Sequence, residues 1–249
     1  MSDVLVAKGL SKEFKGFFAV KNVDLSVQRG SVHALIGPNG AGKTTLFNLL
    51  TKFLKPSAGT ITYEGEDITA RSSEDIARLG LVRSFQISAV FGDLTVLENV
   101  RIALQRRRGD SYDFWRSETV LSEYDDEARD YIESVGLSEF VANRAAELSY
   151  GRKRALEIAT TLALSPNMLL LDEPMAGMGQ EDIERISALI KRIAEGRTIL
   201  MVEHNLSVVA NLSDRITVLA RGEVLAEGDY DAISKSPEVI EAYIGAGHD

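Results

Sequence analysis

A glycine-rich segment, GPNGAGKT at residues 37–44, constrains the fold of this chain more than any other stretch. It fits the pattern G-x-x-x-x-G-K-[ST], in which glycines let backbone N–H groups wrap phosphate oxygens. The apolar run SVHALIG precedes it, and TTLFNLLTKFLKP follows with apolar residues on one helical face as far as Leu54, before Pro56. Residues 31–55 therefore predict a strand, a phosphate-binding loop and a helix. This context disfavours a glycine-rich turn that only joins a strand to a helix.

Two side chains at the end of this loop have chemistry suited to a nucleotide. Lys43 is placed to reach the outer phosphates, and the hydroxyl group of Thr44 can bind Mg²⁺. The N-terminus of the following helix adds positive potential at the same point. The loop therefore predicts a site for a nucleoside phosphate and a magnesium ion.

Two further buried-strand patterns end in polar residues. NMLLLDEP contains Asp172 and Glu173, and RTILMVEH ends in His204. Open α/β sheets place ligands at the carboxyl ends of their strands. Asp172 can hold Mg²⁺ through water, and Glu173 can orient or deprotonate an attacking water. The alternative is that these acids only end a strand and cap the next helix. Gln86, after LVRSF, and His204 could reach a γ-phosphate from the same edge, although such residues are more often structural.

The order of the patterns predicts a parallel α/β core with a helical insertion. Residues 23–28 alternate like a strand, GTITYEGEDI reads as a strand pair, and RITVLARGEVLAEGD reads as a terminal hairpin. The segments TVLENVRIALQRRR, DDEARDYIESVGL and GRKRALEIATTLAL predict helices between residues 95 and 163. EDIERISALIKRIAEG predicts an amphipathic helix that Gly196 closes.

Composition limits the classes of function. With 249 residues, 45% of them hydrophobic, the chain is long enough for one large domain or two small ones. Its net charge of −9 counts against DNA or RNA as the main partner. The absence of cysteine excludes disulfides, thiolate catalysis and cysteine-zinc sites. No secretory signal is visible, and no apolar run approaches the roughly 18 residues that span a bilayer, so we expect any membrane role to come through a partner.

The segment LSYGRKR, residues 148–154, predicts a helix start with an unusual charge. Ser149 can cap the helix, and Gly151 allows a close approach. Arg152, Lys153 and Arg154 crowd the first turn, where each cation is disfavoured by roughly 0.3–1 kcal/mol. Either these cations face a negatively charged ligand, or their long stems simply extend into water.

Two other segments allow two interpretations each. The run RRR at residues 106–108 predicts a solvated face or loop. The apolar segment ISAVFGDLTV, residues 87–96, directly follows Gln86. It either packs in the core or forms a docking surface whose shape depends on the bound nucleotide.

Five motifs, in this order and at these spacings, resemble those of ABC transporter ATPase subunits. GPNGAGKTT, FQ, LSYGRKRALEIA, LLLDEP and VEH are similar to the Walker A motif, Q-loop, signature motif, Walker B motif and H-loop of that family. The stretches LSYG, DEPMAGM, EHNLSVVANLSDRI and PEVIEAYIG resemble the ATPase subunits of branched-chain amino-acid importers, in the hydrophobic amino-acid uptake group. Alternatives are the ATPases of urea or amide import and of lipopolysaccharide export. Two alternatives lie outside transport: an ABC ATPase that acts on nucleic acid or ribosomes, and a regulator that no longer hydrolyses nucleotide.

The resemblance implies a fold and a division of the chain. The fold would be a P-loop NTPase core of the RecA-like type, with a β-subdomain and an inserted helical subdomain, as in ABC ATPases. Residues 1–86 and 164–225 would form the nucleotide-binding core, and residues 87–163 would form the helical subdomain with the signature motif. Residues 226–249 would form a C-terminal segment.

The resemblance also implies roles for individual residues. Glu173, His204, Gln86 and Lys43 would be catalytic, and Thr44, Gln86 and Asp172 would hold Mg²⁺. The nucleotide would be bound by Phe14, Gly37, Pro38, Asn39, Gly40, Ala41, Gly42, Lys43, Thr44, Thr45, Ser149 and Gly151. Phe14 would stack on adenine, with Phe17 and Phe18 as rivals. Two positions depart from the family pattern: Arg152 stands where Gln is frequent, and Gly179 stands where Asp or Asn is common and supplies no side-chain contact across a dimer.

The partners implied by the resemblance are a second ATPase subunit, identical or related, and transmembrane permease subunits. Two ATPase subunits would sandwich ATP head to tail, so that the LSYG helix of one covers the nucleotide held by Lys43 of the other. The chain would be cytoplasmic and peripheral on the inner face of the cell membrane. It would use ATP and Mg²⁺ and bind no nucleic acid.

Overall fold

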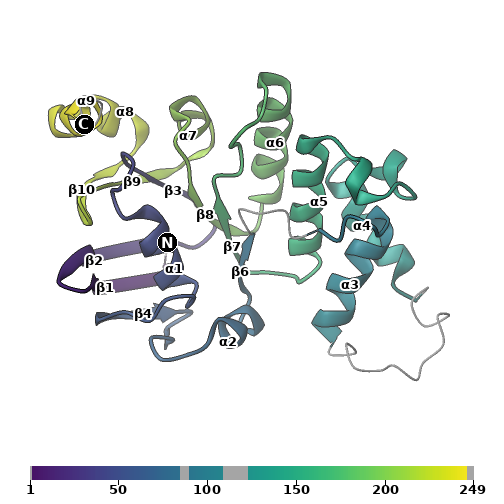
Figure 1. Ribbon diagram of the computed structural model, residues 1–249, viewed down its shortest axis with the longest axis horizontal. Helices are drawn as coiled ribbons and strands as arrows, with labels where there is room; N and C mark the ends of the chain where they lie inside the picture. Colours follow the sequence, from purple (N-terminus) through teal and green to yellow (C-terminus); the bar gives the residue numbers. More distant parts are fainter. Residues whose placement is uncertain (1, 85–89, 109–122, 246–249) are drawn as a thin grey trace.

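Two β-sheets organise the part of the chain that the structure describes. The computed structural model describes residues 2–84, 90–108 and 123–245 (Figure 1). One sheet has four antiparallel strands in the order β2-β1-β4-β5, and the other has six strands in the order β10-β9-β3-β8-β7-β6. The strands of the smaller sheet are β1 (Asp3–Phe14), β2 (Phe17–Gln28), β4 (Ala58–Tyr63) and β5 (Glu66–Asp67). The strands of the larger sheet are β3 (Val32–Ile36), β6 (Leu81–Ser84), β7 (Met168–Asp172), β8 (Thr198–Val202), β9 (Arg215–Ala220) and β10 (Glu223–Gly228).

The larger sheet is parallel except for its edge strand β10, which pairs antiparallel with β9. The register aligns the carboxyl ends of three strands: Leu35 of β3 pairs with Val202 of β8, and Val202 pairs with Asp172 of β7. The segments that follow β3, β7 and β8 therefore leave the sheet at one edge. These segments are the glycine-rich loop (37–44), the segment that begins with Glu173 after β7, and the segment that begins with Glu203 after β8.

Helices cover both faces of the larger sheet (Figure 1). The helices are α1 (Lys43–Leu50), α2 (Ser73–Arg78), α3 (Val96–Arg108), α4 (Asp125–Ser134), α5 (Tyr150–Leu162), α6 (Gln180–Ile193), α7 (Leu206–Leu212), α8 (Tyr230–Ser234) and α9 (Pro237–Gly245). The short 3₁₀ turns η2 (Ser138–Phe140) and η3 (Ala145–Glu147) precede α5. Among these described segments, no helix is long and apolar enough to cross a membrane.

Two hydrophobic cores lie on opposite faces of the larger sheet. Along β7, Leu169 and Leu171 face a core shared with α3 to α6, whereas Met168 and Leu170 face a core shared with α1 and the smaller sheet. Strands buried on both faces read as continuous apolar runs, which explains the patterns MLLL and TILMV. The helices α1 and α5 consequently pack against opposite faces of the sheet.

Most of the predicted elements are confirmed, but the helix after the glycine-rich loop is shorter than predicted. Helix α1 ends at Leu50, and Thr51 donates its hydroxyl hydrogen to the carbonyl oxygen of Phe47 at 2.7 Å. Lys52 then takes a left-handed backbone conformation, with φ 61°. Phe53 is therefore 52% exposed and is not on the buried face of a helix.

The helical insertion contains a second correction, because a solvated face is wrong for Arg107. Its guanidinium donates to Ser165 Oγ at 2.8 Å and to Glu127 Oε1 at 2.6 Å, which ties α3 to α4 and to the loop after α5. Arg106 is exposed, as predicted.

The apolar segment 87–96 lies partly outside the described residues, because residues 87–89 and Gln86 are not among them. Val96, at 0% exposure, packs in the core as one interpretation predicted, whereas Phe91 is 55% exposed, so core packing is wrong for the Phe91 side chain. Its backbone is held by Asn99, which accepts from Phe91 N at 2.7 Å and donates to Phe91 O at 3.1 Å. An exposed aromatic ring on a fixed backbone suits the docking interpretation, which stays a prediction.

Candidate nucleotide-binding site

The glycine-rich loop runs from the end of β3 to the start of α1 and is closely packed at both ends. Gly37 has φ 150°, and a Cβ atom there would lie 2.2 Å from the carbonyl oxygen of Leu219. Gly42 has φ 99°, and its Cβ would lie 2.4 Å from the carbonyl oxygen of Ala19. A side chain at either position would collide with backbone, so only glycine fits. The middle of the loop, Asn39 and Gly40, is exposed.

The Lys43 ammonium group lies inside the curve of this loop. It donates to the carbonyl oxygens of Gly37 at 2.6 Å and Pro38 at 3.0 Å. Burial lowers the pKa of Lys43, and the nearby Glu173 carboxylate opposes part of that shift. The first turn of α1 carries no acid, so the positive end of the helix is not neutralised locally. Thr44 is exposed and Thr45 half-buried in this first turn. The loop thus presents a lysine and a helix N-terminus, a combination suited to phosphate.

The acid pair lies at the carboxyl end of β7. Asp172 is the last residue of the strand and is 2% exposed. Glu173 adopts a left-handed conformation with φ 45°, and its N–H donates to the carbonyl oxygen of Val202 at 3.0 Å. A non-glycine residue in this region costs of order 1–3 kcal/mol, and such strain is frequent at functional sites. The sharp turn at Glu173 therefore holds its carboxylate near Lys43 at the edge of the sheet.

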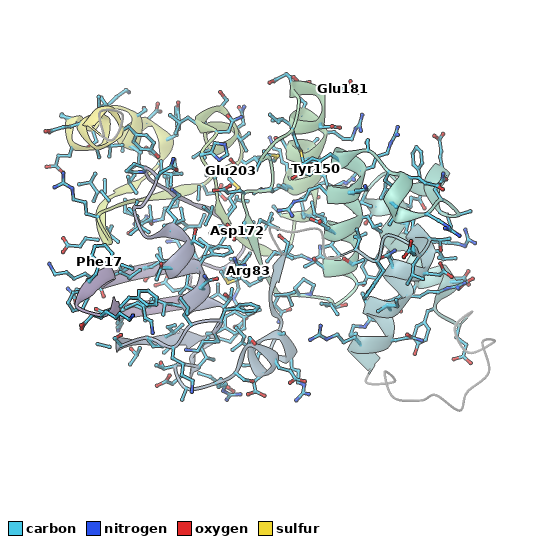
Figure 2. All side chains as sticks on the ribbon, viewed as in Figure 1. Phe17, Arg83, Tyr150, Asp172, Glu181 and Glu203 are labelled. Atoms are coloured by element: carbon cyan, nitrogen blue, oxygen red, sulfur yellow. The ribbon has the colours of Figure 1, made fainter. Side chains whose placement is uncertain are left out.

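Arg83 contacts Asp172 of this pair, and its role was not predicted from the sequence (Figure 2). Its guanidinium donates to Asp172 Oδ2 at 2.5 Å and to Asn48 Oδ1 at 2.5 Å. The rings of Phe47 and Phe53 lie 5.1 Å and 5.5 Å from the same guanidinium carbon. The available signal was an arginine within the apolar strand LVRS, a position that requires a buried partner.

Glu203 is the second residue that the sequence analysis overlooked. Its carboxylate is fully buried and accepts three backbone N–H groups, from Met175 at 3.0 Å, His204 at 3.0 Å and Asn205 at 3.2 Å. It therefore joins the segment after the acid pair to the segment after β8. His204 itself is exposed at this edge, and Asn205 caps α7 by accepting from Ser207 N at 3.1 Å. An acid within the buried run TILMVEH was the signal.

The three cations of LSYGRKR have different surroundings. Arg154 is buried and donates to Glu157 Oε2 at 2.5 Å and to the carbonyl oxygen of Asp172 at 3.0 Å. Arg152 lies over the ring of Phe140, 4.2 Å from its centroid. The prediction that all three side chains simply extend into water is therefore wrong for Arg152 and Arg154. Lys153 is half-buried and has no ion pair among the described residues.

The start of α5 also differs in detail from the prediction. Ser149 occupies the N-cap position, but its side chain makes no capping hydrogen bond. Gly151 is buried against α6, and a Cβ atom there would lie 2.4 Å from Asp182 Oδ1. Among the described residues, no hydrogen bond or ion pair joins Ser149 or Gly151 to the glycine-rich loop. Tyr150 between them is 54% exposed (Figure 2).

The aromatic candidates for base stacking lie at the β1–β2 hairpin. Phe14 is 44% exposed and Phe18 is 42% exposed. Phe17, labelled in Figure 2, lies at the hairpin turn and is 69% exposed. Lys12 lies 5.2 Å from the centroid of the Phe14 ring. The contact between Ala19 and Gly42 brings this hairpin against the phosphate loop. All three rings remain available to a planar ligand.

The donor set at the edge of the sheet is suited to magnesium with a phosphate ligand. Among residues 2–84, 90–108 and 123–245, no cluster of three or more His, Cys, Asp or Glu side chains could hold a metal alone. Mg²⁺ usually binds one or two protein oxygen groups together with substrate phosphates and water. The Thr44 hydroxyl and the Asp172 carboxylate meet that requirement. Gln86, the third predicted metal ligand, lies outside the described residues.

A glycine-rich loop that encloses a lysine, beside an acid pair on a parallel strand, defines a P-loop ATPase. The family model described as ABC transporter matches residues 20–176. The chain belongs to this family, as the ATP-binding and ATP-hydrolysing subunit of a transporter. A second model, described as branched-chain amino acid ATP-binding cassette transporter, matches residues 223–249.

Individual relatives match nearly the whole chain. The high-affinity branched-chain amino acid transport ATP-binding protein BraF of Pseudomonas aeruginosa is 39% identical over 252 residues, covering 97% of this chain and 98% of its own. LivG of Escherichia coli, with the same description, is 39% identical over 249 residues, with the same coverage. The crystal structure of the ADP conformation of an ATP-binding cassette of an ABC transporter superposes with a TM-score of 0.86 at 31% identity, covering 98% of this chain and 100% of that one. The predicted ABC ATPase fold is thereby confirmed.

Proposed function

We propose that this ATPase subunit energises the import of branched-chain or other hydrophobic amino acids. The observation that carries the proposal is the match of residues 223–249 to the branched-chain amino acid cassette model, beyond the part matched by the general ABC transporter model. The full-length similarity to BraF and LivG supports the same substrate class. The related urea, amide and lipopolysaccharide systems remain the alternatives.

We propose that Lys43 and the loop from Gly37 to Thr45 bind the phosphates of ATP. The enclosed ammonium group, which already bonds two carbonyl oxygens of the loop, supports this role. Thr44 and Asp172 are proposed to hold Mg²⁺ together with Gln86. Bound Mg²⁺ would supply positive charge that offsets charge developing on the phosphate oxygens.

We further propose that Glu173 orients or deprotonates the attacking water and that His204 contacts the γ-phosphate. The strained backbone of Glu173 and its position near Lys43 support the first role. The position of His204 directly after β8, at the edge where β7 also ends, supports the second. Catalysis in this scheme consists of positioning and electrostatic stabilisation. We also propose that adenine stacks on Phe14, with Phe17 and Phe18 as rivals. The exposure of these rings, on a hairpin that approaches the phosphate loop at Gly42, supports this role.

The proposed assembly is a head-to-tail pair of ATPase subunits, in which Ser149 and Gly151 of one subunit meet the nucleotide of the other. The TM-score of 0.75, at 26% identity, to the dimeric structure of a bacterial ABC transporter cassette supports a dimer; that match covers 91% of this chain and 98% of that one. Permease subunits are the proposed membrane partners, which would hold the chain on the inner face of the membrane. We propose the same division of the chain as the sequence predicts: a core (1–86 and 164–225), a helical subdomain (87–163) and a C-terminal segment (226–249). We propose no nucleic-acid partner.

The test of the catalytic assignment is phosphate release by the wild type and by Glu173→Gln. We expect Glu173→Gln to retain ATP binding and to lose at least about 99% of turnover, since general-base catalysis contributes typically 10²–10⁴-fold. Glu181→Gln is the matched control, because Glu181 is an exposed acid in the first turn of α6. Near-normal turnover of Glu173→Gln would remove this residue from the catalytic role.

The test of the substrate is co-purification of the tagged chain with its membrane subunits, followed by reconstitution in vesicles. ATP-dependent uptake of leucine, isoleucine or valine is expected. Uptake of urea or amides instead would replace the proposed substrate class without affecting the ATPase assignment.

A further inference from the structure

Arg83 is a largely buried cation that connects three elements around the site. It lies in β6, one residue before the end of that strand, and its side chain is 11% exposed. Its guanidinium reaches α1 at Asn48 and the end of β7 at Asp172, both at 2.5 Å. The Asp172 side chain is only 3% exposed, so the pair is largely withdrawn from water.

Several contacts fix the guanidinium in place. The rings of Phe47 and Phe53 approach it at 5.1 Å and 5.5 Å, which is within the range of cation–π attraction. Asn48 and Phe47 both belong to α1, the helix that begins at Lys43. The position of the Arg83 charge is therefore tied to the phosphate-binding helix, and the position of the Asp172 carboxylate is tied to Arg83.

This arrangement gives Asp172 a permanent counter-charge. A buried ion pair with little access to water is weakly screened, so a second cation at the same carboxylate is repelled by the first. The proposed function assigns Mg²⁺ to Asp172 and Thr44. Arg83 and Mg²⁺ would then share one carboxylate.

We infer that Arg83 is a positioning residue that holds the Asp172 carboxylate at the end of β7 and weakens its attraction for Mg²⁺. Arg83 thereby sets the Mg²⁺ concentration at which the site binds nucleotide tightly. This inference rests on the proposed magnesium site, and it adds a residue that acts through Asp172 without touching the nucleotide.

The test is a titration of Mg²⁺ at fixed ADP, with ADP binding followed by calorimetry. Removal of the counter-charge in Arg83→Gln leaves Asp172 more attractive to a divalent cation. We expect the Mg²⁺ concentration for half-maximal tight binding to fall about tenfold, which corresponds to about 1.4 kcal/mol. Arg83→Lys keeps the charge but loses the planar fork that bonds two partners, so we expect a smaller fall, of about threefold.

The matched control is Arg101→Gln. Arg101 is also a partly buried arginine paired with an acid, Asp125, but it joins α3 to α4 away from the site. Its thermal midpoint should fall while its Mg²⁺ midpoint stays at the wild-type value, which separates a general loss of stability from the proposed effect.

The outcomes distinguish the inference from the function on which it rests. If Mg²⁺ has no effect on ADP binding by the wild type, the magnesium assignment fails and the inference fails with it. If the wild type responds to Mg²⁺ but a folded Arg83 variant has an unchanged or higher midpoint, the inference alone is overturned. Arg83→Lys decides the matter should Arg83→Gln not fold.

Discussion

Replacement of Glu203 by glutamine is the sharpest test of how this site is held together. The substitution conserves shape, but it exchanges one carboxylate oxygen for an NH₂ group and removes the charge. Three backbone N–H groups converge on the carboxylate, from Met175, His204 and Asn205, at 3.0–3.2 Å. A glutamine can accept at only one end, so at least one of these donors faces another donor.

The expected loss of stability follows from those contacts. A buried donor left without an acceptor costs about 1–3 kcal/mol, and hydrogen bonds to a charged group contribute about 1.5–3 kcal/mol each. We expect the free energy of unfolding to fall by about 3 kcal/mol. For a chain of this size, about 2–4 °C is lost per kcal/mol, so the thermal midpoint should fall by about 6–12 °C.

The functional effect should be selective. Met175 lies in the segment after the acid pair, and His204 lies in the segment after β8, so loss of the shared carboxylate displaces both segments. We expect turnover to fall at least about tenfold, which is about 1.4 kcal/mol of barrier. The affinity for ATP should persist, because among the described residues no hydrogen bond or ion pair joins the Glu203 side chain to the loop around Lys43.

Thermal melting, phosphate release and ATP-binding calorimetry on one preparation test this prediction. Glu98→Gln is the control: Glu98 Oε2 accepts from Thr95 N at 2.7 Å in the helical insertion, away from the site. It should lose some stability and keep full turnover. If Glu203→Gln melts within about 2 °C of the wild type and turns over normally, the carboxylate does not organise these segments.

Three further predictions concern other residues. Burial, reinforced by the charge of Arg215, lowers the pKa of His33 to about 4, below its unfolded value of 6.5. The contribution of neutral His33 to the free energy of unfolding should therefore be complete above pH 6.5 and fall by up to about 3 kcal/mol as the pH falls to 4. Urea unfolding of His33→Gln should lack that part of the decline. Gly151→Ala should lower the free energy of unfolding by about 1–3 kcal/mol, since its Cβ would lie 2.4 Å from Asp182 Oδ1. In the double mutant, Asp182→Ala should restore part of this loss. If the two single-mutant losses, measured by urea unfolding, simply add in the double mutant, the clash is refuted. Lys43→Ala should weaken ATP binding at least about tenfold in calorimetry while melting normally, and unchanged affinity would refute the phosphate-binding role.

The sequence predicts the loop and the strand ends well because their requirements are local. Gly37 and Gly42 are recognisable since no other residue fits against the neighbouring backbone. Asp172 and Glu173 are recognisable because they end an apolar run in a parallel sheet. Both features depend on a few consecutive residues.

Contacts between distant segments escape the sequence analysis. The end of α1 was missed because the apolar spacing continues to Leu54, whereas the chain turns at Thr51 and Lys52. Arg83 and Glu203 were missed because their partners lie on other strands and loops. The tight contact between Gly151 and Asp182 was missed for the same reason. A substitution such as Gly151→Asp would therefore place a carboxylate against the Asp182 carboxylate of the same chain.

The buried pair of Arg154 and Glu157 restricts how this chain can change by mutation. Loss of Arg154 alone leaves the buried Glu157 carboxylate without this cation, at a cost of about 3–5 kcal/mol, against a total stability of about 5–15 kcal/mol for a typical domain. Because Arg154 also donates to the Asp172 carbonyl oxygen, loss of Arg154 would also remove a hydrogen bond that holds the backbone of the acid pair. A substitution at Arg154 is therefore tolerated best together with one at Glu157, such as an apolar pair of similar volume. A library that varies one position at a time would record Arg154 as immutable and would miss the alternative pairs that fold.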